Sequence, residues 1–194
     1  MIESILTRRQ VAFGKKITVK TLVSVGIVAL AVLLPQLMHL VAGAQAGVRF
    51  LPMYLPVLLA GCLLGPVWGL GVGILAPIAS YLVTSAFGDP MPALARLPFM
   101  VAELAVFAFV SGMFSKKIAE NAWFALPAVL LGEIAGRAFF LLSVVIFQNV
   151  SVLKPAMILS QIRAGWAGLL INAMVVPAVV ALVKVLSDRE KKND

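Results

Sequence analysis

The chain has 194 residues, of which 62% are hydrophobic and only 12% are charged. Soluble domains carry roughly 45–50% apolar and about 25% charged residues, so this composition excludes a water-soluble fold and indicates a chain embedded in a lipid bilayer. The net charge of +8 does not indicate nucleic-acid binding, because the Lys and Arg residues gather at the ends of apolar runs, as membrane topology requires.

Six apolar runs follow one another along the chain, and a transmembrane helix needs about 20 such residues. In chain order the runs cover residues 21–40, 52–65, 68–87, 97–114, 123–150 and 158–185. The second run is short for a full crossing, so we expect it to be tilted or supplemented by the residues before it. We therefore predict an all-α, polytopic membrane protein, a six-transmembrane-helix bundle that forms a single transmembrane domain over residues 1–194.

The distribution of Lys and Arg predicts the orientation of this bundle. Six crossings place both chain ends on one side, which holds eleven of the 16 basic residues, whereas the other side holds three. The side rich in positive charge is cytoplasmic. We expect a cytoplasmic basic segment at residues 1–20 and a cytoplasmic charged tail at residues 187–194. The external loops are then residues 41–51, 88–96 and about 149–157, and the location is a cell membrane.

Glycines recur at every fourth position in Gly61, Gly65, Gly69 and Gly73. Small residues at this spacing allow two helix backbones to approach closely in lipid. The Gly65-Pro66 turn divides the series between two helices, so we interpret it as the packing surface of a helical hairpin. A direct role in passing a substrate is the alternative.

Four ionisable residues fall inside the apolar runs, where each costs roughly 2.5–3.5 kcal/mol on insertion scales and so requires a reason. Glu133 and Arg137 are four residues apart on one helix face, which favours an ion pair. The same Arg137 could instead bind a carboxylate or phosphate of a ligand. Glu103 could bind a substrate, or pair with Arg137 or Arg163.

A polar group also marks the predicted outer part of the last run, where Gln161, Arg163 and Trp166 are followed by the deeper Asn172. A cation, amides and an aromatic ring near the external surface suit the capture of a small polar ligand with a planar part. For Trp166 the alternative is a structural position in the interfacial aromatic belt.

Catalytic and metal chemistry find little support in the sequence. Cys62 is the single cysteine and His39 the single histidine, so a multi-residue metal site lacks ligands. No Gly-rich phosphate-binding motif with a following Lys and Ser or Thr occurs. We expect no enzyme activity, no metal and no cofactor, and any ATP-driven step would need partner proteins.

Spaced Pro, Gly and Glu positions recur through the first two thirds of the chain. They are Phe50-Leu51-Pro52-Met53-Tyr54-Leu55-Pro56, continued by Leu64-Gly65-Pro66, Gly69, Gly73 and Pro77, and then Met91-Pro92 with Glu103-Leu104-Ala105-Val106-Phe107 and Gly112. In this combination the chain resembles the substrate-binding subunits of energy-coupling factor vitamin transporters. The resemblance covers residues 20–115, and the last third of the chain by general character only.

This resemblance implies a six-helix subunit that captures a water-soluble vitamin or related micronutrient at the external face. Such subunits associate with a membrane coupling subunit and two ATPase subunits, which drive delivery inward. The matching positions for substrate binding are Arg49, Met53, Tyr54, Asp89, Arg96, Glu103, Gln148, Asn149, Gln161, Arg163 and Trp166, to which the residue analysis adds Arg137 and Asn172. Docking to the coupling subunit falls on the small residues of the first helix, Ser24, Gly26, Ala29 and Ala31, which lack the family's strict Ala-x-x-x-Ala spacing.

Three other classes of protein compete with this interpretation. A structural or scaffold membrane protein with no small-molecule ligand would use the buried charges only to hold helices together. An intramembrane enzyme would need a paired acid and base, and a stand-alone transporter would show inverted repeats; we find neither in the sequence. The ligand itself stays open among cobalamin, pyridoxine-type compounds, pantothenate, folate and riboflavin, because the arginines favour an anionic group and the aromatic residues favour a ring.

Overall fold

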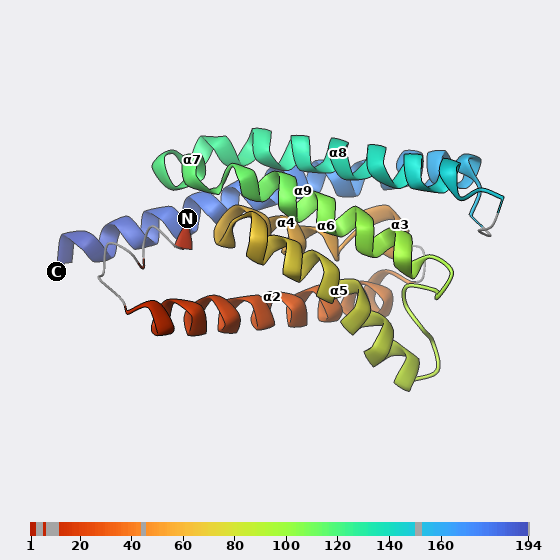
Figure 1. Cartoon of the computed structure of the whole chain (residues 1–194), viewed down its shortest axis with the longest axis horizontal. Helices are drawn as coiled ribbons and strands as arrows, with labels where there is room; N and C mark the ends of the chain where they lie inside the picture. The colour runs from red at the N-terminus through yellow and green to blue at the C-terminus, as the bar shows by residue number, and fades with distance from the viewer. Residues whose placement is uncertain (3–5, 7–11, 44–45, 150–152, 194) are drawn as a thin grey trace.

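The computed structural model describes residues 1–2, 6, 12–43, 46–149 and 153–193, and every secondary-structure element within these ranges is helical. At residues 46, 155 and 190–193 it describes the backbone alone. The long helices lie roughly along the long axis of the molecule and form a bundle (Figure 1). In chain order the helical elements are α2 (Phe13–Ala42), α3 (Ala46–Phe50), α4 (Tyr54–Leu64), α5 (Pro66–Ala86), α6 (Leu97–Met113), α7 (Ser115–Glu120), a 3-10 turn (Ala122–Phe124), α8 (Ala125–Ile146) and α9 (Pro155–Asn193).

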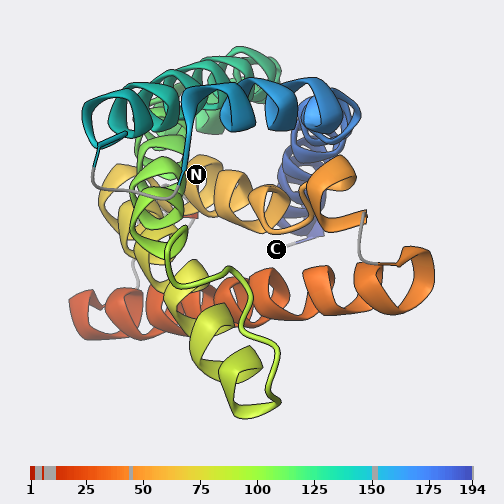
Figure 2. The same cartoon turned by 90° about the vertical axis from the view of Figure 1, so that its right-hand side faces the viewer.

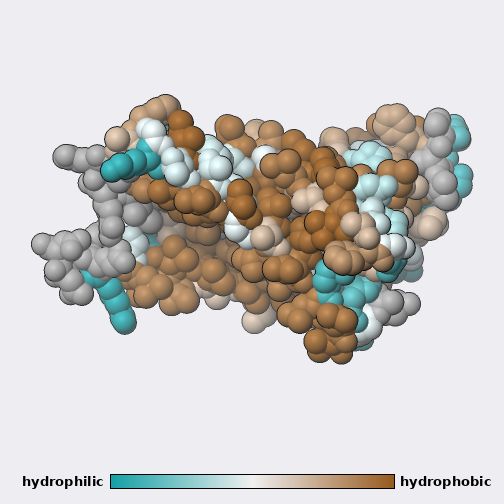
Figure 3. All heavy atoms as spheres, turned by 90° about the horizontal axis from the view of Figure 1, so that it is seen from below, coloured by the Kyte–Doolittle hydropathy of each residue, from teal (hydrophilic) through white to brown (hydrophobic). Residues whose placement is uncertain are grey.

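The helices have the length and composition needed to cross a bilayer. Among the described residues five segments qualify, namely Phe13–Ala42, Gly47–Leu64, Pro66–Ala86, Ala122–Ile146 and Ala156–Arg189, and the apolar helix Leu97–Met113 is slightly shorter. Apolar side chains cover most of the middle of the face seen in Figure 3, and hydrophilic residues gather toward its ends. An apolar belt between polar ends indicates a multi-pass membrane protein.

Several helices extend beyond the predicted runs. Helix α2 begins at Phe13, so Lys15, Lys16 and Lys20 of the predicted basic segment lie on its first turns, whereas Arg8 and Arg9 lie outside the described residues. The predicted loop 41–51 contains α3, and the predicted tail 187–194 is helical as far as Asn193. Hydropathy finds the apolar part of a helix, but hydrogen bonding continues into polar turns until a breaker such as Gly43.

The turn predicted at Gly65-Pro66 is confirmed. Gly65 has a φ of 90°, a left-handed conformation that favours glycine, and its N–H donates to the Gly61 carbonyl at 3.0 Å. Pro66 then begins α5, at a position where its missing N–H costs nothing. The result is a tight hairpin of α4 and α5.

Helix α6 lies at the centre of the bundle and packs against α4, α5 and α8. Glycines permit this contact, because a Cβ at Gly61 would stand 2.5 Å from the Ala108 carbonyl oxygen and one at Gly73 would stand 2.5 Å from the Leu104 oxygen. A Cβ at Gly69 would stand 2.8 Å from the Gly61 Cα, across the hairpin. These contacts confirm that the glycine series is a packing surface.

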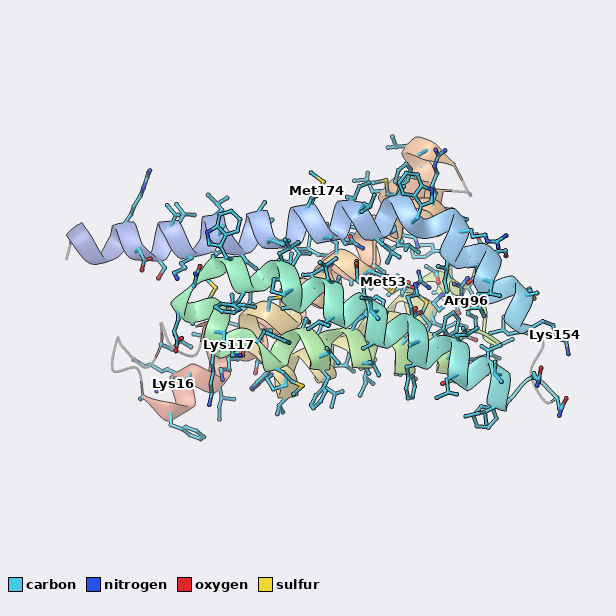
Figure 4. The ribbon with its side chains drawn as sticks, turned by 90° about the horizontal axis from the view of Figure 1, so that it is seen from above. Lys16, Met53, Arg96, Lys117, Lys154 and Met174 are labelled. Carbon is cyan, nitrogen blue, oxygen red and sulfur yellow. The ribbon has the colours of Figure 1, made fainter. Side chains whose placement is uncertain are left out.

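The two chain ends lie at the same end of the bundle (Figure 1). The amino group of Met1 donates to the Ser115 carbonyl at 3.3 Å, and the Lys184 ammonium donates to the Glu120 carbonyl. Figure 4 shows Lys16 and Lys117 near this end and Lys154 at the opposite one. We call them the basic end and the loop end; the loop end carries α3 and residues 87–96.

The glycine contacts predict a position-specific loss of stability. Gly73→Ala should destabilise the protein by about 1–3 kcal/mol, because the backbone of α6 leaves no room for a methyl group. Gly71→Ala is the matched control on the same helix, since a Cβ there meets nothing within 4 Å. Cys62 is buried and is the single cysteine, so a thiol-reactive dye can follow thermal unfolding in detergent. Equal melting temperatures for the two variants would contradict the close packing of α5 on α6.

Candidate functional site

Three buried side chains from three helices meet near the loop end of the bundle. Tyr54 is the first residue of α4, Glu103 lies in α6 and Arg137 lies in α8. The Tyr54 hydroxyl donates to Glu103 Oε2 at 2.9 Å, and Arg137 Nη1 lies 2.9 Å from Glu103 Oε1. We call Tyr54, Glu103 and Arg137 the buried triad. Its carboxylate links α4 to α8 through α6.

The guanidinium of Arg137 has N–H groups that donate no well-aligned hydrogen bond. Its Cζ lies 5.0 Å from the centroid of the Tyr54 ring, a cation–π contact. The approach to Glu103 is close in distance but lacks the alignment of a hydrogen bond, and the Nε and both Nη atoms have no aligned partner. Arg137 is therefore held by charge and by the Tyr54 ring, with hydrogen-bonding capacity to spare.

Glu133 and Asn172 extend the polar interior toward α9. Glu133 interacts electrostatically with Arg137 and lies beside Asn172, and both side chains are buried. Glu133 Oε1 and Asn172 Nδ2 have no hydrogen-bond partner. Of the alternatives left by the sequence, Glu103 takes the ion pair with Arg137, while Glu133 remains within electrostatic range of the same guanidinium.

Arg96 precedes α6 directly and joins three helices. Its Nη2 donates to Gln161 Oε1 of α9 at 2.7 Å, and its Cζ lies 5.9 Å from the ring centroid of Phe140 in α8. The Nε atom is buried without a hydrogen-bond partner. The guanidinium is thus fixed by Gln161 and lies near the Phe140 ring, while its buried Nε has no acceptor.

The segment before Arg96 is tied to α5 by two buried hydroxyl groups. Ser80 Oγ donates to the Met91 carbonyl at 2.8 Å, and the Met91 N–H donates to Thr84 Oγ1 at 2.7 Å. These bonds satisfy the backbone of Met91 on both sides. They hold residues 91–93 against α5, next to the start of α4.

A pocket of about 290 Å³ lies between these elements at the loop end. Tyr54 and Arg96 both line it, so the buried triad lies directly behind one wall; Figure 4 places Met53 and Arg96 in the half of the bundle toward Lys154. The lining residues are Pro35, His39, Gly47, Val48, Leu51, Pro52, Met53, Tyr54, Ser80, Met91, Pro92, Ala93, Arg96 and Met100. The volume is at the lower end of the roughly 300–1,000 Å³ typical of small-molecule sites.

The predicted site residues fall into three groups around this pocket. Met53, Tyr54 and Arg96 line the pocket. Gln161 does not line it but accepts a hydrogen bond from Arg96. Glu103, Arg137 and Asn172 are buried behind it. The side chains of the third group are exposed and do not line the pocket: Arg49, Asp89, Gln148, Asn149, Arg163 and Trp166. The exposure of Trp166 agrees with the alternative of an interfacial position.

Several lining residues were not predicted from the sequence. Pro35 and His39 come from the end of α2, Ser80 from α5, and Met100 from α6. Ser80 could have been predicted from the sequence, because a hydroxyl inside an apolar run must find a hydrogen-bond acceptor. In the sequence, the apolar lining residues cannot be distinguished from apolar residues that contact lipid or the protein core.

The predicted docking residues on α2 differ in exposure. Gly26 and Ala29 are exposed, Ser24 is half-buried and Ala31 is fully buried. The exposed face around them is apolar, with Leu22, Val25, Leu30, Leu33 and Leu37. Gly26 and Ala29 therefore belong to an outward surface, whereas Ala31 belongs to the core.

The site has the character of a binding pocket. Within the described part of the chain no group of three or more His, Cys, Asp or Glu residues could hold a metal ion. Comparisons with protein-family models, with curated proteins and with solved structures find no match for this chain.

The buried triad predicts a large stability cost for removing one charge. Glu103→Gln should cost about 3–5 kcal/mol, because Arg137 would stay buried without a counter-charge. Arg163→Gln, which removes an exposed guanidinium, should change stability by less than about 0.5 kcal/mol. Thermal unfolding of Glu103→Gln, of Arg137→Met and of the variant that carries both changes measures the coupling between the two residues. Additive effects in the double variant would contradict the ion pair.

The Thr84 hydroxyl predicts local order in the loop end. Thr84→Val should leave the Met91 N–H without its acceptor and loosen residues 87–96, at a cost of about 1–3 kcal/mol. Ser143→Ala is the control, since that hydroxyl only bonds the Phe139 carbonyl of its own helix. Limited proteolysis should cut the Thr84→Val variant faster within residues 87–96, and equal rates would exclude this anchoring role.

Proposed function

We propose that this protein is the substrate-specific membrane subunit of an energy-coupling factor importer. It captures a water-soluble vitamin or related micronutrient at the external face of a prokaryotic cell membrane. A membrane coupling subunit and two ATPase subunits then drive delivery to the cytoplasm. The bundle crosses the membrane six times, with both termini cytoplasmic.

The proposed orientation is supported by the separation of charge between the two ends. Lys15, Lys16, Lys20, Lys116, Lys117, Lys184 and Arg189 lie at the basic end or on the helical turns next to it, whereas Arg49, Arg96 and Lys154 lie toward the loop end. The positive end faces the cytoplasm. The pocket is then at the external end, where capture from dilute solution takes place.

The pocket at the loop end is the observation that carries the proposal. It combines a cavity of about 290 Å³ with a cation, Arg96, in its wall. Buried polar groups of the triad lie behind Tyr54. Ionisable groups at membrane depth commonly mark a substrate site. The exposed small and apolar face of α2 offers a separate surface for the coupling subunit.

A structural membrane protein is the second candidate, and the buried triad favours it in one respect. An ion pair closed off from lipid would hold α4, α6 and α8 together with no ligand present. Ligand binding distinguishes the two candidates, because a ligand that binds only the folded state stabilises it by an amount that rises with the logarithm of the ligand concentration above Kd.

Blocking the pocket should abolish ligand retention. Protein purified in mild detergent, without denaturant, is expected to carry a small molecule that mass spectrometry detects. Ala93→Trp should remove it, because Ala93 lines the pocket and an indole would fill part of the cavity. Ala95→Trp is the matched control, since Ala95 is exposed and lies outside the lining.

One result would contradict the importer, namely wild-type protein that carries no small molecule and is stabilised by none of a panel of water-soluble vitamins. Retention of the same molecule by Ala93→Trp and Ala95→Trp alike would exclude this pocket as the binding site. Co-expression with a coupling subunit and ATPases should also give vitamin uptake by intact cells.

A further inference from the structure

The charges that line the pocket restrict the ligand. Among the described lining residues none is acidic, and Arg96 carries the one guanidinium. The Glu103 carboxylate behind the wall is bonded to Tyr54, paired with Arg137 and within electrostatic range of Arg96. A cationic ligand would therefore meet Arg96 and find no carboxylate in the lining, whereas an anion would find a positive charge.

Most hydrogen-bonding groups of the lining are already in use. The Tyr54 hydroxyl donates to Glu103, and the Ser80 hydroxyl donates to the Met91 carbonyl. His39 is half-buried, and its Nε2 lies beside Gly47, where an added Cβ would stand 3.0 Å away. Arg96 lines the pocket, its Nη2 donates to Gln161, and its Nε is buried. The pocket thus offers a ligand one permanently charged side chain, that of Arg96.

The rest of the lining is apolar and adaptable. Met53, Met91 and Met100 contribute thioether side chains, and Pro35, Pro52 and Pro92 contribute rigid apolar rings. Methionine adapts its shape to irregular ligands and packs well on rings. A ligand with many hydroxyl or amide groups would leave them unpaired here, at a cost for each one.

We propose that the pocket binds a small monocarboxylate with a mostly apolar body, whose carboxylate is held by Arg96 and whose body packs among Met53, Met91 and Met100. This inference rests on the proposed function and names its substrate class. The volume of about 290 Å³ fits a compound of this kind. The hydrogen bond from Arg96 Nη2 to Gln161 fixes the position of the guanidinium at the pocket wall.

Matched pairs of anionic and neutral probes test the proposal. The pairs are nicotinate and nicotinamide, pantothenate and panthenol, and lipoate and lipoamide, with thiamine as a cationic probe. Binding is measured by thermal stabilisation and by titration, using the full chain in phosphatidylcholine nanodiscs. At least one carboxylate should bind about tenfold or more tightly than its neutral partner, as a charge-assisted hydrogen bond requires.

Arg96→Gln should reduce that preference to about onefold, since the cation that distinguishes the pair is gone. Lys154→Gln is the control: it removes an exposed positive charge at the loop end, outside the lining, and should keep the full preference. The ratio between two probes is measured within one protein. A loss of stability in Arg96→Gln therefore does not imitate the expected result.

Four outcomes would overturn the inference. Three are binding of none of the carboxylates, a preference for the neutral or cationic probe, and an unchanged preference in Arg96→Gln. The fourth is competition by added phosphatidylglycerol, because the anion would then be a lipid headgroup. If a neutral or cationic vitamin binds saturably instead, this inference fails while the importer stands; if the protein binds no vitamin at all, both fail.

Discussion

The carboxylate of Glu103 is the interaction on which the arrangement of the bundle depends. It is buried at the centre of α6, where a lone charge would be costly, so it must be met by polar groups from neighbouring helices. Tyr54 comes from the first residue of α4 and Arg137 from the middle of α8. Because Tyr54 also lines the pocket, the same interaction that joins three helices fixes one wall of the candidate site. The glycines that let α4 and α5 approach α6 are a condition for this contact.

The sequence predicts well what depends on neighbouring residues. Apolar runs mark the helices, and Gly65-Pro66 marks the hairpin, because both signals act over a few residues. The partner of Arg137 cannot be predicted in this way. Spacing favours Glu133 one turn away, yet the close contact is with Glu103 of another helix, and this depends on how α6 and α8 are rotated against each other. That rotation is fixed by packing among several helices at once and leaves no mark in local spacing.

The pocket shows the same division between local and long-range information. Met53, Tyr54 and Arg96 were predicted on the strength of the family resemblance and of their polar or aromatic character. Pro35 and Met100 line the same pocket but come from distant parts of the chain and carry no chemical signal. Arg49, Asp89, Arg163 and Trp166 are exposed in this structure, so a role for them in binding stays a prediction. Chemistry can be predicted from residue type, whereas a cavity arises only where helices diverge.

The two hydroxyl bonds between α5 and Met91 have a mechanical consequence for the pocket wall. They lie one turn or more beyond Pro77, which cannot donate a hydrogen bond within α5 and so weakens the helix at that level. In Figure 2 the outer turns of α5 and the segment after them extend together beyond α2. Because Met91 is hydrogen-bonded to α5, the segment that contains it is held against the helix. The outer α5 turns and residues 91–93 therefore form one connected part of the pocket wall, to which Ser80, Pro92 and Ala93 all belong.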